Sequence, residues 1–370
     1  MNLLKTNREN LLQPLQAVSG IIERRHTLPI LSNVLMTRAG GKLSFVATDI
    51  EIEITAAAKV EASGEDKALT VGARKLQDIL RALPDGSEVS LTLTEKKLQV
   101  KSGKSRFNLQ TLPAEDFPRL AAAEIGGVTL KLPQKLLKDL LAMVQYAMAQ
   151  QDIRYYLNGL LMVVDAGQLK VIATDGHRLA FASKEIGSAE TGGKQEVILP
   201  RKTVLELVKL LGDTDEPVSI ELSATQARFR FGDILLASKL VDGKFPDYQR
   251  VIPAQHPKLL RLDRSVLQQA LQRAAILTSD KFRGVRWVLT ENSLKISCSN
   301  TEQEEAQEEL DLSYSGEALD IGFNVSYLLD VLNHLETEHV EVALGDPNSS
   351  ALITIPERAD FKYVVMPMRI

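Results

Sequence analysis

Apolar residues recur at helical spacing in three stretches that are similar to one another. The stretches are DILRAL from Asp78, ELVKLL from Glu206 and DVLNHL from Asp330. In each of them apolar residues lie three and four positions apart, as on the buried face of an amphipathic helix. Each is followed by a strand-like alternation, which is EVSLTL from Glu88, VSIELS from Val218 and VEVAL from Val340. The pattern predicts a helix–strand unit that occurs three times.

Three further features recur in the same order, at intervals of about 125 residues. An amphipathic helix opens each unit, as NRENLLQPLQAV from Asn7, LPQKLLKDLLAMV from Leu132 and LDRSVLQQALQRA from Leu262. A strand follows, as LSFVATD from Leu43, LKVIATD from Leu169 and LKISCSN from Leu294. The first two units close on LPAEDFP from Leu112 and LVDGKFP from Leu240, whereas the third ends as FKYVVMPMRI. The shared order and period indicate an internal repeat.

The repeat predicts three similar α+β domains in a row, each with two helices and antiparallel sheets. A length of 370 residues is too great for one compact core, and roughly 150 residues per domain predicts two or three domains. The turn signals place boundaries near Gly127 and Pro257. The expected domains are therefore residues 1–127, 128–257 and 258–370.

Composition narrows the class of protein. Hydrophobic residues make up 44% and charged residues 25% of the chain, which is ordinary for a globular protein. There is no run of about 18 apolar residues that could span a membrane, and MNLLKTNREN becomes polar too early for a signal peptide. Cys298 is the only cysteine, which excludes an internal disulfide and a multi-cysteine zinc site. We expect a cytoplasmic protein without membrane association.

Charge leaves two interpretations open. The net charge of −4 excludes a protein that is basic all over, as many nucleic-acid binders are. Basic residues still recur beside the predicted helices, whereas acidic residues crowd the segments EIEI and TEQEEAQEELDL. This distribution suits either a basic face that follows a phosphate backbone or ordinary solvated helices. Aromatic residues, at 5%, are too scarce for a surface that stacks single-stranded bases.

One segment suggests catalysis without completing a catalytic site. ATDGHR brings Asp175, His177 and Arg178 close together, and an aspartate and a histidine can form a general-base pair. A hydrolase that uses Asp175 and His177 on a repeated scaffold is therefore the alternative function. The sequence has no GxSxG, HExxH or GxxxxGKS motif, and its five histidines lack metal-ligand spacing. We expect no metal, no cofactor and no catalytic residue, and favour a turn or a binding-site edge.

Eight segments distributed over essentially the whole chain carry a family resemblance. They are TLPIL from Thr27, QDIRYYLNG from Gln151, ATDGHRLA from Ala173, SKLVDGKFPDY from Ser238, KFRGVR from Lys281, EQEEAQEEL from Glu302, IGFNVSYLLDVLN from Ile321 and YVVMPMR from Tyr363. On these segments the chain resembles the bacterial DNA sliding clamps, the beta subunits of the replicative DNA polymerase III.

The resemblance implies a processivity factor and not an enzyme. In such a protein two chains join head to tail, as a homodimer, into a closed ring of six similar domains. The ring encircles duplex DNA without reading its sequence. It tethers replicative and repair DNA polymerases, and a clamp loader is a further partner.

The resemblance also implies three sets of site residues. The dimer interface sets Phe107 and Leu109 against Ile276 and Leu277, and Lys75, Lys104 and Arg106 against Glu302, Glu304, Glu305 and Glu308. The DNA-facing residues are Arg25, Arg74, Gln151, Arg201 and Lys202. The partner-peptide pocket comprises Leu157, Thr174, Gly176, His177, Arg178, Leu179, Pro246, Val251, Asn324, Tyr327, Ser350, Val364, Met366, Pro367, Met368 and Arg369. Its leucine, valine, proline and methionine residues suit leucine or phenylalanine anchors of a peptide.

Overall fold

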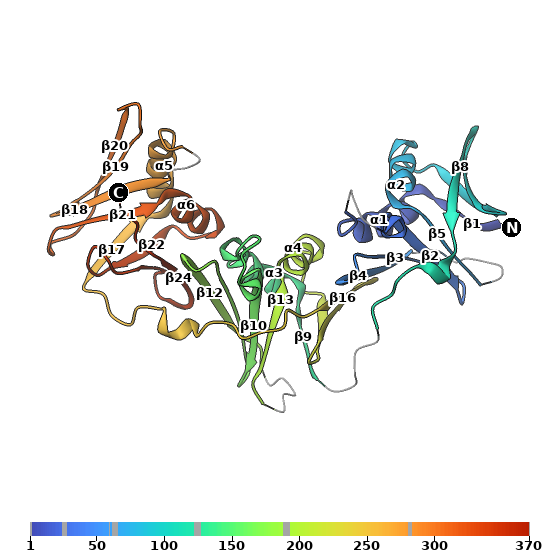
Figure 1. The fold of residues 1–370 in the computed structure, drawn as a ribbon, viewed down its shortest axis with the longest axis horizontal. Helices are drawn as coiled ribbons and strands as arrows, with labels where there is room; N and C mark the ends of the chain where they lie inside the picture. Colours follow the sequence, from blue (N-terminus) through green and yellow to red (C-terminus); the bar gives the residue numbers. More distant parts are fainter. Residues whose placement is uncertain are drawn as a thin grey trace. The chain divides into compact units, whose positions relative to one another are not determined.

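The computed structural model describes residues 2–23, 28–58, 60, 66–121, 127–187, 193–279 and 283–369. Its α-helices are α1 (Arg8–Ser19), α2 (Ala73–Ala82), α3 (Gln134–Ala142), α4 (Arg201–Leu210), α5 (Arg264–Ala275) and α6 (Val325–His334). Each third of the chain contributes two of these helices, as the periodicity predicts (Figure 1). Helix α1, for example, buries Leu11, Leu15 and Val18, which lie on one face because they are about one helical turn apart.

The described residues form two compact units, and the central third of the chain contributes to both. The first unit consists of Met1–Leu136 and Leu205–Leu240, and the second of Leu137–Val204 and Val241–Ile370. Short 3₁₀ segments occur at η1 (Pro29–Ser32), η2 (Ala114–Asp116), η3 (Gln145–Ala147), η4 (Tyr155–Leu157) and η5 (Tyr248–Arg250). The sequence repeat and the compact units are therefore different divisions of the same chain.

The first unit is built on a twelve-stranded antiparallel sheet, in the order β1-β6-β7-β8-β5-β2-β3-β4-β16-β15-β14-β9. The strands are β1 (Asn2–Asn7), β2 (Asn33–Ala39), β3 (Lys42–Thr48), β4 (Ile52–Ala58), β5 (Lys67–Gly72), β6 (Glu88–Thr94), β7 (Lys97–Ser102), β8 (Ser105–Leu112), β9 (Val128–Pro133), β14 (Pro217–Leu222), β15 (Gln226–Phe231) and β16 (Ile234–Lys239). In β9 the residues Val128, Leu130 and Leu132 are buried while Thr129 and Lys131 are exposed. One face of the sheet is thus packed and the other is solvated.

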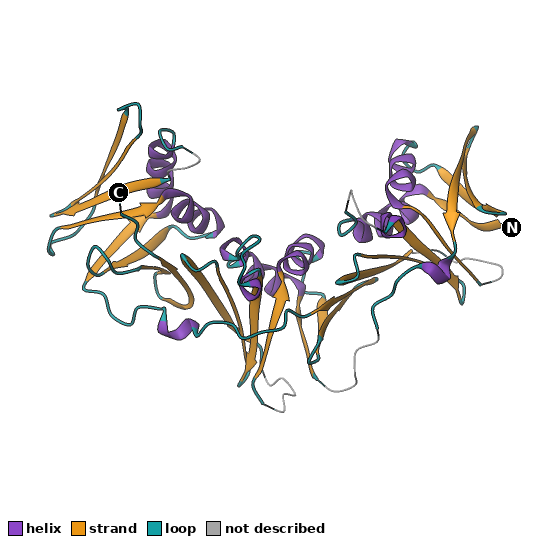
Figure 2. Ribbon diagram, viewed as in Figure 1, coloured by secondary structure: helices purple, strands orange, loops and turns teal. Residues whose placement is uncertain are grey.

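The second unit contains an eight-stranded sheet and a four-stranded sheet (Figure 2). The larger sheet has the order β13-β10-β11-β12-β24-β23-β22-β17, with β10 (Gly159–Asp165), β11 (Gln168–Thr174), β12 (Arg178–Glu185), β13 (Gln195–Pro200), β17 (Lys258–Asp263), β22 (His339–Leu344), β23 (Ala351–Ile355) and β24 (Arg358–Val365). The smaller has the order β20-β19-β18-β21, with β18 (Gly284–Thr290), β19 (Ser293–Ser299), β20 (Glu305–Asp311) and β21 (Leu319–Asn324). Cys298 is buried in β19.

Strand pairing between neighbouring thirds of the chain follows the repeat. β4 pairs with β16, with Ile52 opposite Ser238, and β12 pairs in the same way with β24, with Arg178 opposite Val365. β4, β12 and β20 occupy equivalent positions in the three thirds of the chain. β8, β16 and β24 are likewise equivalent to one another. Among the described residues β20 pairs only with β19, and β8 pairs with β7 and, at one end, with β5. One edge of β20 and most of one edge of β8 are therefore open.

Candidate partner-binding site

The ATDGHR segment is a rigid turn between β11 and β12. The Thr174 hydroxyl donates to the Arg178 carbonyl at 2.6 Å. One carboxylate oxygen of Asp175 accepts the backbone N–H groups of His177 at 2.9 Å and of Arg178 at 3.1 Å. Gly176 has a φ of 90°, a conformation that side chains with a Cβ rarely adopt. These contacts hold the backbone of the turn in one conformation.

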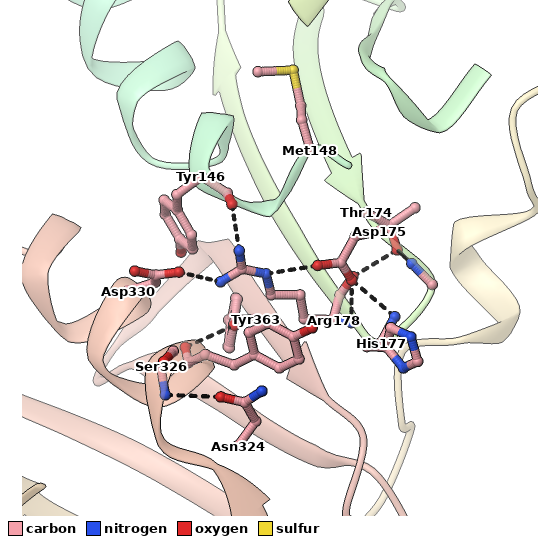
Figure 3. A network of polar contacts seen from close by, with 12 residues as sticks. Tyr146, Met148, Thr174, Asp175, His177, Arg178, Asn324, Ser326, Asp330 and Tyr363 are labelled. Carbon is pink, nitrogen blue, oxygen red and sulfur yellow. Dashed lines mark hydrogen bonds and ion pairs between the residues drawn. The ribbon is translucent and has the colours of Figure 1, made fainter. Parts of the chain in front are cut away.

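Arg178 is the centre of a polar network that joins this turn to α6 (Figure 3). Its guanidinium donates to Asp175 at 3.1 Å, to Asp330 at 2.5 Å and to the Tyr146 carbonyl at 2.6 Å. It also lies over the Tyr327 ring, 4.4 Å from the ring centroid. The side chain is only 9% exposed, so its charge is retained because every face of the guanidinium has a partner.

Burial and charge act on Arg178 and its aromatic neighbours in different directions. Burial by itself would lower the pKa of Arg178. Tyr363 and Asp330 raise this pKa by more than burial lowers it, so that it lies above its ordinary value. Burial raises the pKa of both Tyr146 and Tyr363. Arg178 is thus a fixed cation beside two phenol groups whose raised pKa values keep them protonated.

The alternative hydrolase interpretation is wrong. The Asp175 carboxylate is occupied by Arg178 and by two backbone N–H groups. The His177 ring instead stacks beside Tyr327, with 6.5 Å between the ring centroids. An aspartate that is committed to structural donors, beside a histidine ring that packs elsewhere, does not form a general-base pair.

The apolar residues predicted for the pocket differ in their burial. Leu157, Leu179 and Val364 are each no more than 2% exposed, and the last two belong to one cluster of the second unit. Val251 and Met366 are 46% and 48% exposed. All sixteen residues predicted for the pocket lie in the second unit.

The C-terminal segment is fastened to this site through its backbone. The Met366 N–H donates to the His177 carbonyl at 2.9 Å, and the Met368 N–H donates to the Gly322 carbonyl at 2.8 Å. Because Met366 is half exposed, it does not fill the core of the C-terminal third. Pro246 and Arg369 are also exposed, as are Gly176 and His177.

Other predicted pocket residues have structural roles as well. The Asn324 side chain caps α6 by accepting the Ser326 N–H at 2.9 Å. The Tyr327 carbonyl accepts the Tyr363 hydroxyl at 2.9 Å, and the Ser350 carbonyl lies 2.8 Å from a ring nitrogen of His256. Pro367, Thr174 and Met368 complete the predicted set and are partly or fully buried.

Sequence reasoning missed the residues that support the turn from other elements. Tyr146 and Asp330 hold Arg178, and Arg154 donates to the Asp175 carbonyl at 3.3 Å. Arg154 is itself held by two hydrogen bonds to the Asp152 carboxylate, and these bonds lower the pKa of Asp152 to about 2. The only signal in the sequence was that Asp152 and Arg154 lie in QDIRYYLNG, a segment of the resemblance.

Comparison of the chain with known proteins identifies its family. Models of the N-terminal, central and C-terminal domains of the DNA polymerase III beta subunit match residues 2–121, 131–247 and 249–369. The beta sliding clamps of Pseudomonas putida and Escherichia coli are each 48% identical over 363 residues, which covers 98% of this chain and 98% of each relative. The chain belongs to the DNA polymerase III beta subunit family.

Solved structures of the family agree over the full length. A DNA polymerase sliding clamp from Pseudomonas aeruginosa with ligand is 47% identical, with a TM-score of 0.95 and 100% of both chains covered. A sliding clamp from Bartonella birtlesii bound to griselimycin is 39% identical, with the same TM-score and coverage. The protein is thus a sliding clamp, a non-catalytic processivity factor of DNA replication with three similar clamp domains.

The residues expected at the clamp's dimer interface lie on exposed parts of both units. Basic Lys75, Lys104 and Arg106 are exposed, and so are acidic Glu302, Glu304 and Glu305. Ile276 is 76% exposed, whereas Leu277, Phe107 and Leu109 are half-buried. Glu308 already has a partner within its own chain, because Arg273 donates two hydrogen bonds to it at 2.8 and 2.6 Å.

The residues expected to face DNA differ in solvent exposure and in their contacts within the chain. Arg74 and Gln151 are exposed, while Arg201 and Lys202 are half-buried, and Arg25 lies outside the described residues. Burial lowers the pKa of Arg201, and its guanidinium donates to the Met148 carbonyl at 3.3 Å.

Three other basic residues on the clamp's helices are engaged within the chain. Arg8 donates to the Leu83 carbonyl at 2.6 Å, Arg264 donates to the Thr337 carbonyl at 2.9 Å, and Arg273 binds Glu308. The basic character of the helices is thus partly structural.

No described helix is long and apolar enough to cross a membrane. Within the part of the chain that the structure describes, no group of three or more histidine, cysteine, aspartate or glutamate side chains could hold a metal ion.

Proposed function

We propose that two copies of this sliding clamp close head to tail into a six-domain ring around duplex DNA in the cytoplasm. The six domains are residues 1–127, 128–257 and 258–370 of each chain. We further propose that the groove beside Arg178 docks short peptide segments of replicative and repair DNA polymerases and of a clamp loader. The observation that carries the ring is the pair of open edges on β20 and β8.

The repeat supplies the rule by which these edges pair. β4 joins β16 and β12 joins β24, so two of the three equivalent strand pairs are made within the chain. The third pair, β20 with β8, is then made between two chains. An open edge presents unpaired N–H and C=O groups that favour such an addition. A head-to-tail contact of this kind closes into a ring when the rotation between copies fits.

The register within the chain predicts the register between the chains. The β4–β16 ladder, transferred to β20 and β8 through their matching hairpins, sets Ser105 opposite Glu308 and Leu109 opposite Glu304. Arg106 then lies opposite Gln307 of the other chain, with Glu305 and Glu309 as its diagonal neighbours on the same face, where opposite charges attract each other. The order of charges along the two edges thus favours the antiparallel register of the other two ladders.

Apolar side chains supply the driving force for closure. Phe107 and Leu109 alternate along β8 and remain half-exposed in the single chain. Ile276 is 76% exposed just after α5. Removing such apolar surface from water favours association of the two chains.

The size of the proposed ring suits duplex DNA. Twelve helices, each about 10 Å wide, give a circle whose opening is roughly 28 Å across, and a B-form duplex is roughly 20 Å across. Arg25, Arg74, Gln151, Arg201 and Lys202 would face this opening. Contacts across a layer of water are weak and sequence-independent, as sliding requires.

The groove suits a short peptide with large apolar side chains. Leu157, Leu179 and Val364 form a buried floor, and Val251 and Met366 an exposed rim. Methionine side chains adapt to different anchors because they are flexible and polarisable. The exposed polar residues His177 and Arg369 are available to orient the peptide backbone.

Topological retention on DNA tests this function. The clamp, loaded onto a nicked circular plasmid, is expected to stay with the DNA through gel filtration and to be lost when the plasmid is cut. The double variant Ile276→Ala with Leu277→Ala should sediment as a monomer and not be retained. Val266→Ala is the matched control, because Val266 is an exposed apolar residue of α5 outside the proposed interface. Retention after cutting, or a dimeric double variant, would contradict the ring.

A further inference from the structure

The first unit contains a turn that repeats the ATDGHR turn bond for bond. The Thr48 hydroxyl donates to the Ile52 carbonyl at 2.8 Å. One carboxylate oxygen of Asp49 accepts the N–H groups of Glu51 at 3.0 Å and of Ile52 at 2.8 Å. The same donors and acceptors, at equivalent positions, hold the turn of the second unit. The backbone of this turn is therefore present twice in the chain.

The strand beside the turn is repeated as well. The Lys239 N–H donates to the Glu51 carbonyl at 2.9 Å, as the Met366 N–H donates to the His177 carbonyl at 2.9 Å. Lys239 therefore occupies the place of Met366, and Glu51 that of His177. The strand registers that follow, β4 with β16 and β12 with β24, agree with this correspondence.

The side chains at these equivalent positions differ in charge. Met366 is an exposed apolar rim residue, whereas Lys239 forms an ion pair with Glu51 at 3.2 Å. Glu53 follows Ile52, the first residue of β4, as Leu179 follows Arg178, the first residue of β12. A carboxylate thus lies where the groove of the second unit has an apolar floor.

Glu53 also fastens the connector that follows the first third of the chain. Its carboxylate accepts two hydrogen bonds from Arg119, at 2.9 and 2.8 Å, and one from the Leu120 N–H at 3.0 Å. Glu53 is 8% exposed and Phe117 of the same connector 4% exposed. The residue in the second connector that matches Pro118 is Pro246, which is exposed.

We propose that Glu53 with Arg119, and Glu51 with Lys239, close the first junction to apolar peptides and so limit each chain to one docked partner. A peptide anchor at this place would displace the connector and leave the Glu53 carboxylate buried without its donors, which is strongly unfavourable. The inference rests on the proposed docking of peptides at the second junction. These residues then determine which of two similar turns binds partners.

Peptide stoichiometry tests the inference. The probe is a fluorescein-labelled peptide with leucine and phenylalanine anchors from the polymerase of the same organism, titrated by anisotropy and calorimetry. The unaltered clamp is expected to bind one peptide per chain. A variant with Glu53→Leu, Arg119→Ala, Glu51→His and Lys239→Met is expected to bind two. Adding Leu179→Glu, which blocks the second junction, should reduce that number to one.

Two controls separate the possible failures. Leu179→Glu in the otherwise unaltered clamp should bind no peptide, and continued binding would overturn the docking function itself. If that control succeeds but the fourfold variant, folded by circular dichroism and dimeric by sedimentation, still binds one peptide, the proposed closure is wrong. Should the fourfold variant not fold, hydrogen exchange of the Leu120 amide decides instead. Its exchange should accelerate at least tenfold in Glu53→Gln, and an unchanged rate would overturn the closure.

Discussion

Arg178 on β12 and Asp330 on α6 are separated by 152 positions in the chain and lie 2.5 Å apart, guanidinium nitrogen to carboxylate oxygen. Because Arg178 also holds Asp175 at 3.1 Å, one side chain joins the turn of the candidate groove to a helix of the C-terminal third. The groove and the packing of α6 on this sheet therefore depend on the same residue.

Replacing Arg178 should cost both stability and peptide binding. Arg178→Met removes the guanidinium that donates to Asp175, Asp330 and the Tyr146 carbonyl, and breaking a buried charged network costs about 3 kcal/mol of unfolding free energy. Urea unfolding followed by fluorescence measures this loss. Arg154→Met is the control, because the Arg154 side chain is 46% exposed and its removal should cost under about 1 kcal/mol. Equal losses for both variants would contradict the central role of Arg178.

Removal of the C-terminal rim should abolish docking and leave the dimer intact. Deleting residues 366–370 removes the exposed Met366 together with its backbone bond to His177. These residues lie outside the β8 and β20 edges, so sedimentation should still show a dimer. Fluorescence anisotropy with the labelled polymerase peptide should lose its binding signal. Undiminished binding by the truncated dimer would exclude the C-terminal segment from the groove.

A methyl group at Gly159 should separate two strands of the second unit. A Cβ built there lies 2.6 Å from the Leu199 carbonyl oxygen, and this atom belongs to the paired backbone of β13. We expect Gly159→Ala to lower the unfolding free energy by about 2 kcal/mol, as overpacking does in other cores. Gly72→Ala is the control, since the nearest atom to a Cβ at Gly72 is 3.9 Å away. Thermal unfolding of the two variants provides the comparison.

Acid should weaken the loop that contains Asp152. Hydrogen bonds from the Arg154 side chain and from the Arg154 backbone N–H lower the pKa of Asp152 from 3.8 to about 2. A carboxyl group whose pKa is lower in the folded than in the unfolded protein stabilises the fold at pH values above its unfolded-state pKa. This contribution is lost as the pH falls through its folded-state pKa. The difference in unfolding free energy between the unaltered clamp and Asp152→Asn should therefore be constant above about pH 4 and decline toward pH 2. A difference that is independent of pH across this range would show that the ion pair contributes nothing.

Local patterns were enough to predict the elements of this protein. Apolar spacing predicted the helices of the described residues, from α1 at Arg8–Ser19 to α6 at Val325–His334, and alternation predicted strands that follow them. Both patterns depend on which face of an element is buried, and that property repeats every few residues. The internal repeat likewise depends only on order and spacing.

The partners of charged residues could not be predicted in this way. Arg8 and Arg264 lie in the first turn of a helix, as Arg74 does, yet the structure engages the first two with carbonyl groups and leaves Arg74 exposed. A guanidinium reaches acceptors that are distant in the chain, so its neighbours follow from packing and not from its own segment.

The sequence by itself determined that this chain has three similar α+β repeats, and through its motifs which family it resembles. Only the tertiary structure decided the roles of the charges within that frame. It put Asp330 and Tyr146 around Arg178 and set Glu53 against Arg119 at the equivalent turn. The physical reason is range: periodicity is a property of consecutive residues, whereas desolvating a charge requires partners that folding brings from distant positions.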